Sequence, residues 1–174
     1  MVQAAEPRHH ALDAHAEAGV RHRAVAARVE VPGEGVLRKI VRADAGGNLW
    51  RTTGDIADRW EIMSTIGFTQ DDLAPFGGPG RWNDPDMLEV GNGKMSAAEY
   101  RAHMTLRAVL AAPLIAGHDV GSSSPETIAL LTNRDVIAID REPLGRPGRR
   151  VVQRGPFEVW TRPLTGKRVV GRLI

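Results

Sequence analysis

Three short apolar segments alternate with three helical patterns between residues 48 and 131. The apolar segments cover 49–53, 88–90 and 114–116, and the helical patterns cover about 58–67, 96–112 and 124–131. Alternation of this kind predicts an α/β fold built from parallel βαβ units. In such folds the carboxyl ends of the strands carry the chemistry. Polar residues that follow the apolar segments are therefore the candidates for a site.

Helix-start signals leave one aspartate unassigned. Asp58 is expected to cap the first helix, with Glu61 three residues further on, as in a capping box. Asp55 could cap the same helix, but Asp58 suits that position better, so Asp55 is free at the carboxyl end of the first strand. The second and third helices begin at Ser96 and Ser124, two residues that cap helices well.

Two carboxylates, an amide and a tryptophan are gathered within the stretch 77–93. The motif WNDPDM at 82–87 lies there between glycine-rich turns. Proline removes a backbone donor, and Asp and Asn compete for backbone hydrogen bonds, so this motif is expected to form a loop. Trp82 and Met87 favour burial, and polar groups among large apolar ones indicate a pocket wall. The alternative is an Asx-turn beside a core tryptophan.

Length and composition limit the classes of protein. The chain has 174 residues, a formal net charge of +2 and no cysteine. A complete (β/α)8 barrel typically needs about 250 residues, which is more than this chain has. Its scattered arginines are mixed with acids, so no nucleic-acid partner is expected. No apolar run approaches the roughly 18 residues of a membrane span, and no signal peptide is recognised. The chain as written is expected to be cytoplasmic, or secreted if the true amino terminus is missing.

The two ends of the chain differ from its centre. Residues 1–47 contain no aromatic residue but four of the six histidines, and the segment 1–45 is left unassigned. The spacing of these histidines favours a solvated face over a metal cluster, so no metal is expected. A Pro/Gly/Arg-rich linker at 142–148 leads into 149–174, where valine-rich segments predict the first strands of an all-β unit.

Two motifs carry a resemblance to a known family. WRTTGDI at 50–56 and GPGRWNDPDML at 78–88 resemble the melibiase-type α-galactosidases of glycoside hydrolase family 27. The resemblance covers about residues 46–165. It implies that 46–148 form the carboxyl-terminal part of a (β/α)8 TIM barrel, about strands six to eight. It also implies that 149–174 begin an antiparallel β-sandwich.

The resemblance implies a retaining hydrolysis of terminal α-D-galactosyl residues, with two aspartates and no cofactor. It places the acid/base role on Asp55 and sugar binding on Arg51, Asp86 and Met87. The expected partner is an α-galactoside oligosaccharide or glycoconjugate. A general acid of this kind protonates the departing oxygen and then acts as a base toward water.

The sequence departs from the family at the nucleophile. The family carries this aspartate in a motif such as YxKxD, and residues 1–47 hold nothing similar. Asp84 and Asp86 are candidates for the missing carboxylate, although neither matches its position. The chain alone is therefore expected to be inactive. The alternatives are a noncatalytic, truncated carbohydrate-binding remnant and a related β-L-arabinopyranosidase.

Overall fold

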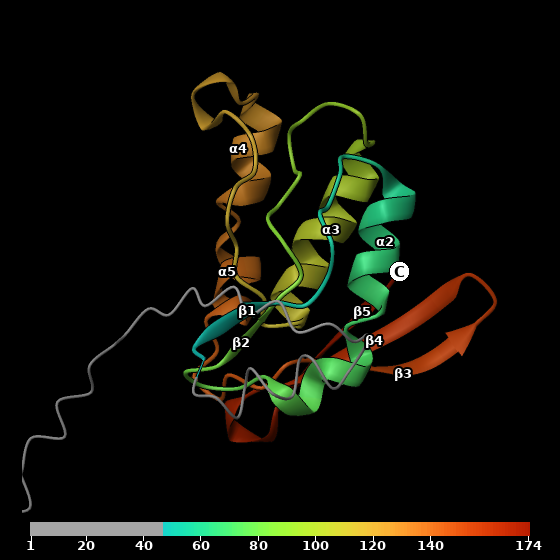
Figure 1. The fold of residues 1–174 in the computed structure, drawn as a ribbon. Helices are drawn as coiled ribbons and strands as arrows, with labels where there is room; N and C mark the ends of the chain where they lie inside the picture. Colours follow the sequence, from blue (N-terminus) through green and yellow to red (C-terminus); the bar gives the residue numbers. More distant parts are fainter. Residues whose placement is uncertain (1–46) are drawn as a thin grey trace, which may run out of the picture.

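The computed structural model describes residues 47–174 (Figure 1). The segment 1–45, with its four histidines, lies outside the described residues. The elements, in chain order, are β1 Leu49–Arg51, α2 Trp60–Phe68, η1 Asp71–Phe76, β2 Trp82–Asp84, α3 Ala97–Val109, η2 Val120–Ser122, α4 Pro125–Leu131, α5 Arg134–Asp140, β3 Arg149–Arg154, β4 Phe157–Pro163, η3 Thr165–Lys167 and β5 Val169–Leu173.

The first two strands are parallel, but the second lies at 82–84 and not at the predicted 88–90. In β1 and β2, Leu49 pairs with Trp82 and Arg51 with Asp84. The prediction of a loop at 82–84 was wrong, because pairing with β1 overrides the weak strand propensity of these residues. The segments 88–90 and 114–116 are not regular strands and meet in one parallel bridge, Leu88 with Ala116.

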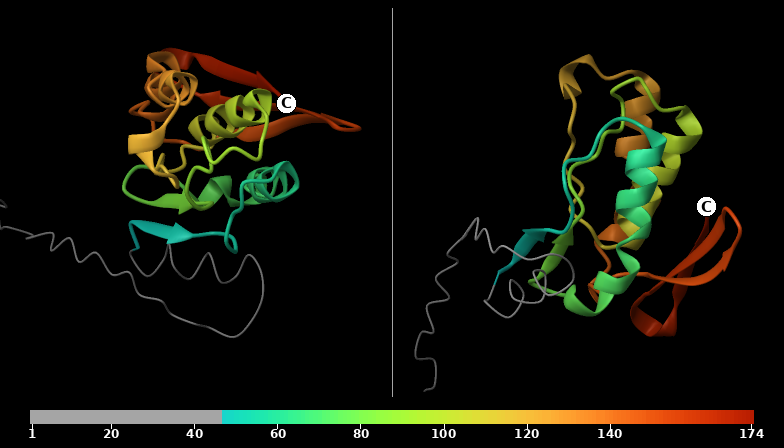
Figure 2. Two further views of the ribbon diagram at one scale, coloured as in Figure 1. Left: turned by 90° about the horizontal axis from the view of Figure 1, so that it is seen from above. Right: turned by 45° about the vertical axis from the view of Figure 1, so that its right-hand side comes forward.

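Helices α2 and α3 pack against each other on one side of the two parallel strands (Figures 1 and 2). Between the layers lies an apolar core that joins both helices to the segment after β2. Its members are Met63 from α2, Leu88 and Val90 after β2, Met95, and Tyr100 and Met104 from α3. This packing fixes the strand ends relative to the helices.

The helix caps agree with the sequence at two of three positions. Ser96 and Glu99 form the complete capping box of α3, and the Ser124 side chain caps α4. The cap predicted for α2 at Asp58 was wrong: its N-cap is Arg59, which makes no side-chain cap bond. The buried Asp58 carboxylate instead accepts hydrogen bonds from the Tyr100 hydroxyl at 2.9 Å and from Lys94 N–H at 2.6 Å. Asp58 therefore binds residues that are distant in the sequence, and it does not cap the helix that follows it.

The carboxyl-terminal strands form a separate antiparallel sheet in the order β3-β4-β5. Trp160 on β4 is completely buried and packs with Leu106 and Val109 from the end of α3 and with Leu110, which caps it. Phe68 stacks on Trp160 with ring centroids 6.4 Å apart. This sheet therefore shares an apolar core with the helices (Figure 2).

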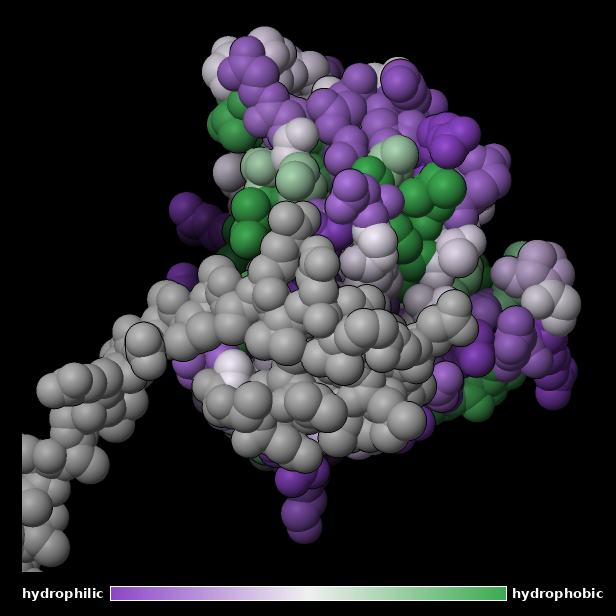
Figure 3. Space-filling model, in the orientation of Figure 1, coloured by the Kyte–Doolittle hydropathy of each residue, from purple (hydrophilic) through white to green (hydrophobic). Residues whose placement is uncertain are grey.

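Hydrophilic side chains dominate the upper part of the face in Figure 3, and apolar ones form smaller patches beneath it. Within residues 47–174, no helix is long and apolar enough to cross a membrane.

Candidate active site

The guanidinium of Arg51 joins two carboxylates at the carboxyl ends of the parallel strands. Its Nη2 donates to Asp86 Oδ2 at 2.9 Å and to Asp55 Oδ1 at 3.2 Å. Arg51 ends β1, Asp55 follows in the next turn, and Asp86 lies two residues beyond β2. Because β1 and β2 are parallel neighbours, their carboxyl ends meet at one edge. The structure thus brings together three of the residues that the sequence proposed for the site.

Asp86 is held rigidly in this group. Its Oδ2 also accepts a hydrogen bond from Ile56 N–H at 2.7 Å, and its Oδ1 accepts one from Met87 N–H at 2.9 Å. The side chain is only 6% exposed. The backbone of Asp86 has φ of 78°, in the left-handed region that non-glycine residues rarely adopt. Strain of this kind is found where the surroundings enforce it, often at functional sites.

An Asx-turn supports the strained conformation. The Asp84 carboxylate accepts a hydrogen bond from Asp86 N–H at 2.9 Å. The Asx-turn that the sequence left open is therefore present.

Asp55 differs from Asp86 in its exposure. Its side chain is 98% exposed, against 6% for Asp86, although both bind the same guanidinium. An exposed carboxylate can reach a bound molecule and exchange a proton with it, whereas a buried one held by several donors is better suited to positioning a ligand.

Asp84 lies beneath the turn and is buried. Burial raises the pKa of the Asp84 carboxyl above its ordinary value, and the Asp86 N–H, Arg51 and Arg107 oppose this rise. Because its side chain is shielded and already bound to the turn, Asp84 is a poor candidate for a nucleophile.

Two buried polar residues of α3 lie behind the carboxylates, and no motif in the sequence points to them. Arg107 Nε donates to His103 Nε2 at 3.2 Å, and both side chains are almost completely buried. Burial and the neighbouring Arg107 lower the pKa of His103 to about 3. His103 is therefore neutral at pH 7. The available signal was a polar pair spaced i, i+4 on the apolar face of a helix.

Met87, the fourth proposed residue, borders the group through its backbone. Its side chain is partly exposed and lies over Gly117, which follows the bridge between Leu88 and Ala116. A Cβ atom at Gly117 would lie 2.5 Å from Met87 Sδ and 2.9 Å from the carbonyl oxygen of Leu88. Gly117 therefore provides the space in which Met87 lies.

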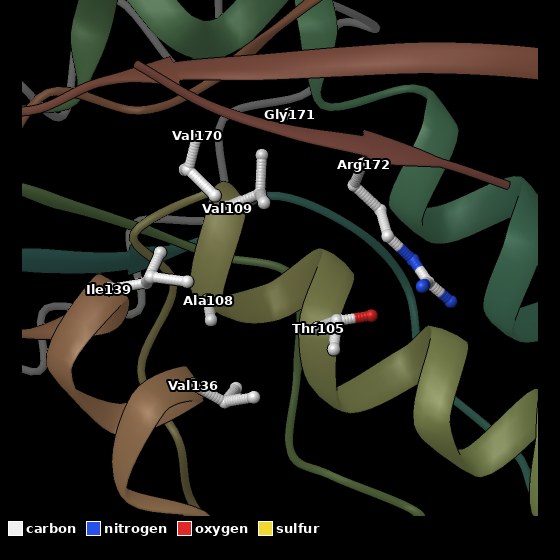
Figure 4. A pocket seen from close by; sticks show the side chains of 8 residues that line it. All are labelled: Thr105, Ala108, Val109, Val136, Ile139, Val170, Gly171 and Arg172. Atoms are coloured by element: carbon white, nitrogen blue, oxygen red, sulfur yellow. The ribbon is translucent and has the colours of Figure 1, made fainter. Parts of the chain in front are cut away.

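An apolar cavity of about 110 Å³ is found elsewhere, between α3, α5 and β5 (Figure 4). It is lined by Thr105, Ala108, Val109, Val136, Ile139, Val170, Gly171 and Arg172. None of the residues bound to Arg51 lines it, so it lies apart from the candidate site. Among the described residues, no three histidine or acidic side chains gather as metal ligands would.

Parallel strands whose carboxyl ends gather polar side chains are the arrangement in which enzymes built from βα units place their sites. Comparison with known proteins makes the relationship specific. Residues 38–142 match the family described as alpha galactosidase A. The chain belongs to this α-galactosidase family.

Individual relatives agree with the family match. An α-galactosidase of Oryza sativa subsp. japonica is 51% identical over 122 residues, which are 70% of this chain and 29% of the rice protein. A Bacteroides fragilis structure, provisionally called an α-galactosidase/melibiase, superposes with a TM-score of 0.75 at 33% identity, over 78% of this chain and 33% of its own. A β-L-arabinopyranosidase of Geobacillus stearothermophilus has a TM-score of 0.72 at 26% identity, over 82% and 36% of the two chains.

These relatives are much longer than the present chain, which spans about a third of their length. The structural neighbours indicate a fold that contains a TIM barrel and a sheet domain, in agreement with the mixed helices and strands described above.

Proposed function

We propose that this chain carries the acid/base and sugar-holding part of a retaining α-galactosidase site. The complete site hydrolyses terminal, non-reducing α-D-galactosyl residues of oligosaccharides or glycoconjugates. In this proposal β1, β2 and the segment 114–116 correspond to strands six to eight of the barrel, within residues 46–148. The sheet β3-β4-β5, within 149–174, begins the β-sandwich.

One observation carries the proposal: a single guanidinium, that of Arg51, joins an exposed and a buried carboxylate at the strand ends. A sugar presents hydroxyl groups that donate to carboxylates and accept from guanidinium groups. Asp86, fixed by three donors, has a lone pair on Oδ1 left for a sugar hydroxyl. Arg51 can donate to a hydroxyl or to the glycosidic oxygen, and Met87 supplies an apolar surface beside them.

Asp55 is assigned the proton transfer. Its exposed carboxyl group protonates the departing glycosidic oxygen, and the resulting carboxylate then takes a proton from the attacking water. Arg51 binds both carboxylates, so it holds the Asp55 side chain near the buried Asp86 and orients it toward the same ligand.

A retaining mechanism needs a second free carboxylate about 5–5.5 Å from the first. Among the described residues the other carboxylates at this site are Asp86, which is engaged at both oxygens, and Asp84, which is buried. We therefore assign the nucleophile to neither of them. The chain alone is expected to bind galactose without hydrolysing galactosides at a measurable rate.

Two measurements on the purified chain test this proposal. Titration with D-galactose should show binding that Asp86→Asn weakens by at least about tenfold, because a charge-assisted hydrogen bond is lost. Asp55→Asn is the matched control, since this side chain is exposed and transfers protons instead of holding the sugar. Equal binding by Asp86→Asn and the parent chain would refute the assignment of Asp86.

Turnover of p-nitrophenyl α-D-galactoside is the second measurement, and little or none is expected. Turnover that Asp55→Asn abolishes would confirm the proton-transfer role and show that the chain also contains the nucleophile. Turnover that Asp55→Asn leaves intact would refute the role assigned to Asp55.

The similarity to the β-L-arabinopyranosidase makes L-arabinopyranose a second candidate sugar. L-Arabinopyranose has the ring hydroxyl arrangement of galactose but lacks its C6 group. A chain that binds L-arabinose at least as tightly as D-galactose would support that specificity. Binding of both sugars without turnover, even in a longer protein that includes the remaining barrel, would support the noncatalytic carbohydrate-binding alternative.

A further inference from the structure

Two loops lead from the parallel strands to the helices that follow them (Figure 1). The loop 52–59 joins β1 to α2 and carries Asp55, and the loop 85–96 joins β2 to α3 and carries Asp86. One link between the two loops lies at the strand ends, where Asp86 Oδ2 accepts the Ile56 N–H at 2.7 Å. The geometry of the site therefore depends on how these loops are held relative to each other.

A second link lies further along the same loops, at the buried side chain of Asp58. Its Oδ2 accepts the Lys94 N–H at 2.6 Å, and its Oδ1 accepts the Tyr100 hydroxyl at 2.9 Å. The Tyr100 oxygen in turn accepts the N–H groups of Gly93 at 2.5 Å and of Met95 at 3.4 Å. Asp58 and Tyr100 thus form a clamp that binds three consecutive N–H groups of the second loop.

Asp55 depends on its backbone for its position, because its side chain makes little contact with the protein. The side chain is 98% exposed, and among residues 47–174 its carboxylate accepts one hydrogen bond, from Arg51 at 3.2 Å. The backbone that follows is held by the bond of Ile56 N–H to Asp86 and, two residues later, by the clamp at Asp58. The segment 55–56 is therefore fixed from its carboxyl-terminal side.

We propose that Asp58 and Tyr100 are positioning residues for the candidate site. By binding the second loop they fix the segment 55–56, and with it the Asp55 carboxylate and the N–H group that Ile56 donates to Asp86. The importance of this position for a sugar rests on the proposed function, whereas the coupling between the two loops does not.

The test removes the clamp in the full chain. Tyr100→Phe keeps the aromatic ring in the core but removes the hydroxyl, so Asp58 loses a donor and the Gly93 N–H loses its acceptor. Asp58→Asn is the second variant, and it keeps the shape of the side chain without its charge. Ser96→Ala is the matched control, because it breaks the capping box at the start of the same helix and leaves the clamp intact.

Hydrogen exchange of the Ile56 N–H is the primary readout, because it reports how often the segment 55–56 opens. Exchange should be about tenfold or more faster in Tyr100→Phe and Asp58→Asn than in the parent chain, since hydrogen bonds to a buried carboxylate are lost. Ser96→Ala should leave it nearly unchanged, although this variant also lowers the stability of the chain. Equal acceleration in the control and the clamp variants, or none in the clamp variants, would overturn the proposal.

Galactose binding is the second readout. Both clamp variants should bind D-galactose about threefold to tenfold more weakly, because Asp86 loses a fixed donor, and Ser96→Ala should bind it as the parent chain does. Equal affinity in the parent chain and the clamp variants would overturn the positioning role. If the parent chain binds no galactose, the proposed function fails, and the exchange of the Ile56 N–H still decides whether the clamp fixes the segment 55–56.

Discussion

Two buried arginines, one in the helix–sheet junction and one behind the candidate site, differ in their hydrogen bonds. Arg162, in the helix–sheet junction, donates from Nη1 to the carbonyl oxygen of Ala108 and from Nη2 to that of Asp140 at 3.2 Å. The corresponding nitrogens of Arg107, behind the site, have no partner among residues 47–174. The same kind of side chain thus binds two backbone carbonyl groups in one place, while its terminal nitrogens bind none of the described residues in the other.

The surroundings of the two arginines differ in the same way. In the junction, the buried Glu158 accepts from Trp160 Nε1 and Arg150 Nη1, both at 2.8 Å, and Trp160 lies in an apolar core. At the site, Asp86 has a strained backbone and its neighbour Asp55 is exposed. Satisfied groups and close packing stabilise a fold, whereas strain and exposed charge are typical of functional positions.

The largest expected effect is in the junction. Trp160→Ala should destabilise the chain by about 3–5 kcal/mol, because it removes a fully buried aromatic side chain and leaves a cavity. Urea unfolding of the variant measures the change. Val152→Ala on β3 is the control, because its side chain is 41% exposed and its loss should change stability by less than about 0.5 kcal/mol. A cost below about 1 kcal/mol for Trp160→Ala would show that the junction is not the stabilising region.

A smaller effect is expected where the site meets the next segment of chain. Gly117→Ala should cost about 1–3 kcal/mol, because the new methyl group overlaps Met87 Sδ and the carbonyl oxygen of Leu88. The control is Gly54→Ala, since nothing lies within 4 Å of a Cβ atom there and its φ is not in the left-handed region. Thermal unfolding of both variants gives the comparison.

The double variant Gly117→Ala/Met87→Ala separates the two contacts. It should recover part of the cost, because only the overlap with the backbone remains. If the double variant recovered no stability, the cost of Gly117→Ala would come from the overlap with the backbone alone, and the overlap with Met87 would contribute nothing.

The sequence predicted local features well and long-range ones less well. The cap at Ser96, the helix at 125–131 and the three carboxyl-terminal strands follow from neighbouring residues, and the structure confirms them. The loop predicted at Trp82–Asp84 was wrong, because a parallel partner 33 residues earlier supplies the pairing (82 − 49 = 33). The cap at Asp58 failed for the same reason: its partner Tyr100 is 42 residues away.

The site shows the same division. A motif can propose Arg51, Asp55 and Asp86, and the structure brings these residues together. The motif gives no sign that Asp55 is exposed while Asp86 is buried, since burial depends on the packing of whole elements. The burial of Arg107 and His103 could not be predicted from the sequence either, because it depends on how α3 packs against the rest of the chain.

The smallest expected effect is a pH dependence that has opposite signs in the two regions. Burial raises the pKa of Asp140, next to Arg162, from 3.8 to about 6, and Arg162 and Arg141 oppose this rise. The stability that the protonated form contributes is complete below about pH 3.8 and is lost as the pH rises through 6. Asp140→Asn abolishes this loss, so the stability of the variant relative to the parent should increase between pH 4 and pH 7. The increase should be modest, because Asp140 is only half-buried and solvent screens its charge.

His103, behind the site, should act in the opposite direction. Its pKa is lowered to about 3 in the folded chain, so its contribution to stability is lost as the pH falls from about 6.5 toward 3. Unfolding temperatures of the parent, Asp140→Asn and His103→Gln at each pH unit from 4 to 7 separate the two contributions. Asp140→Asn should steepen the fall of stability toward low pH, and His103→Gln should flatten it. If both variants changed the slope in the same direction, the two regions would not differ in their response to protons, and the contrast between their buried charges would be lost.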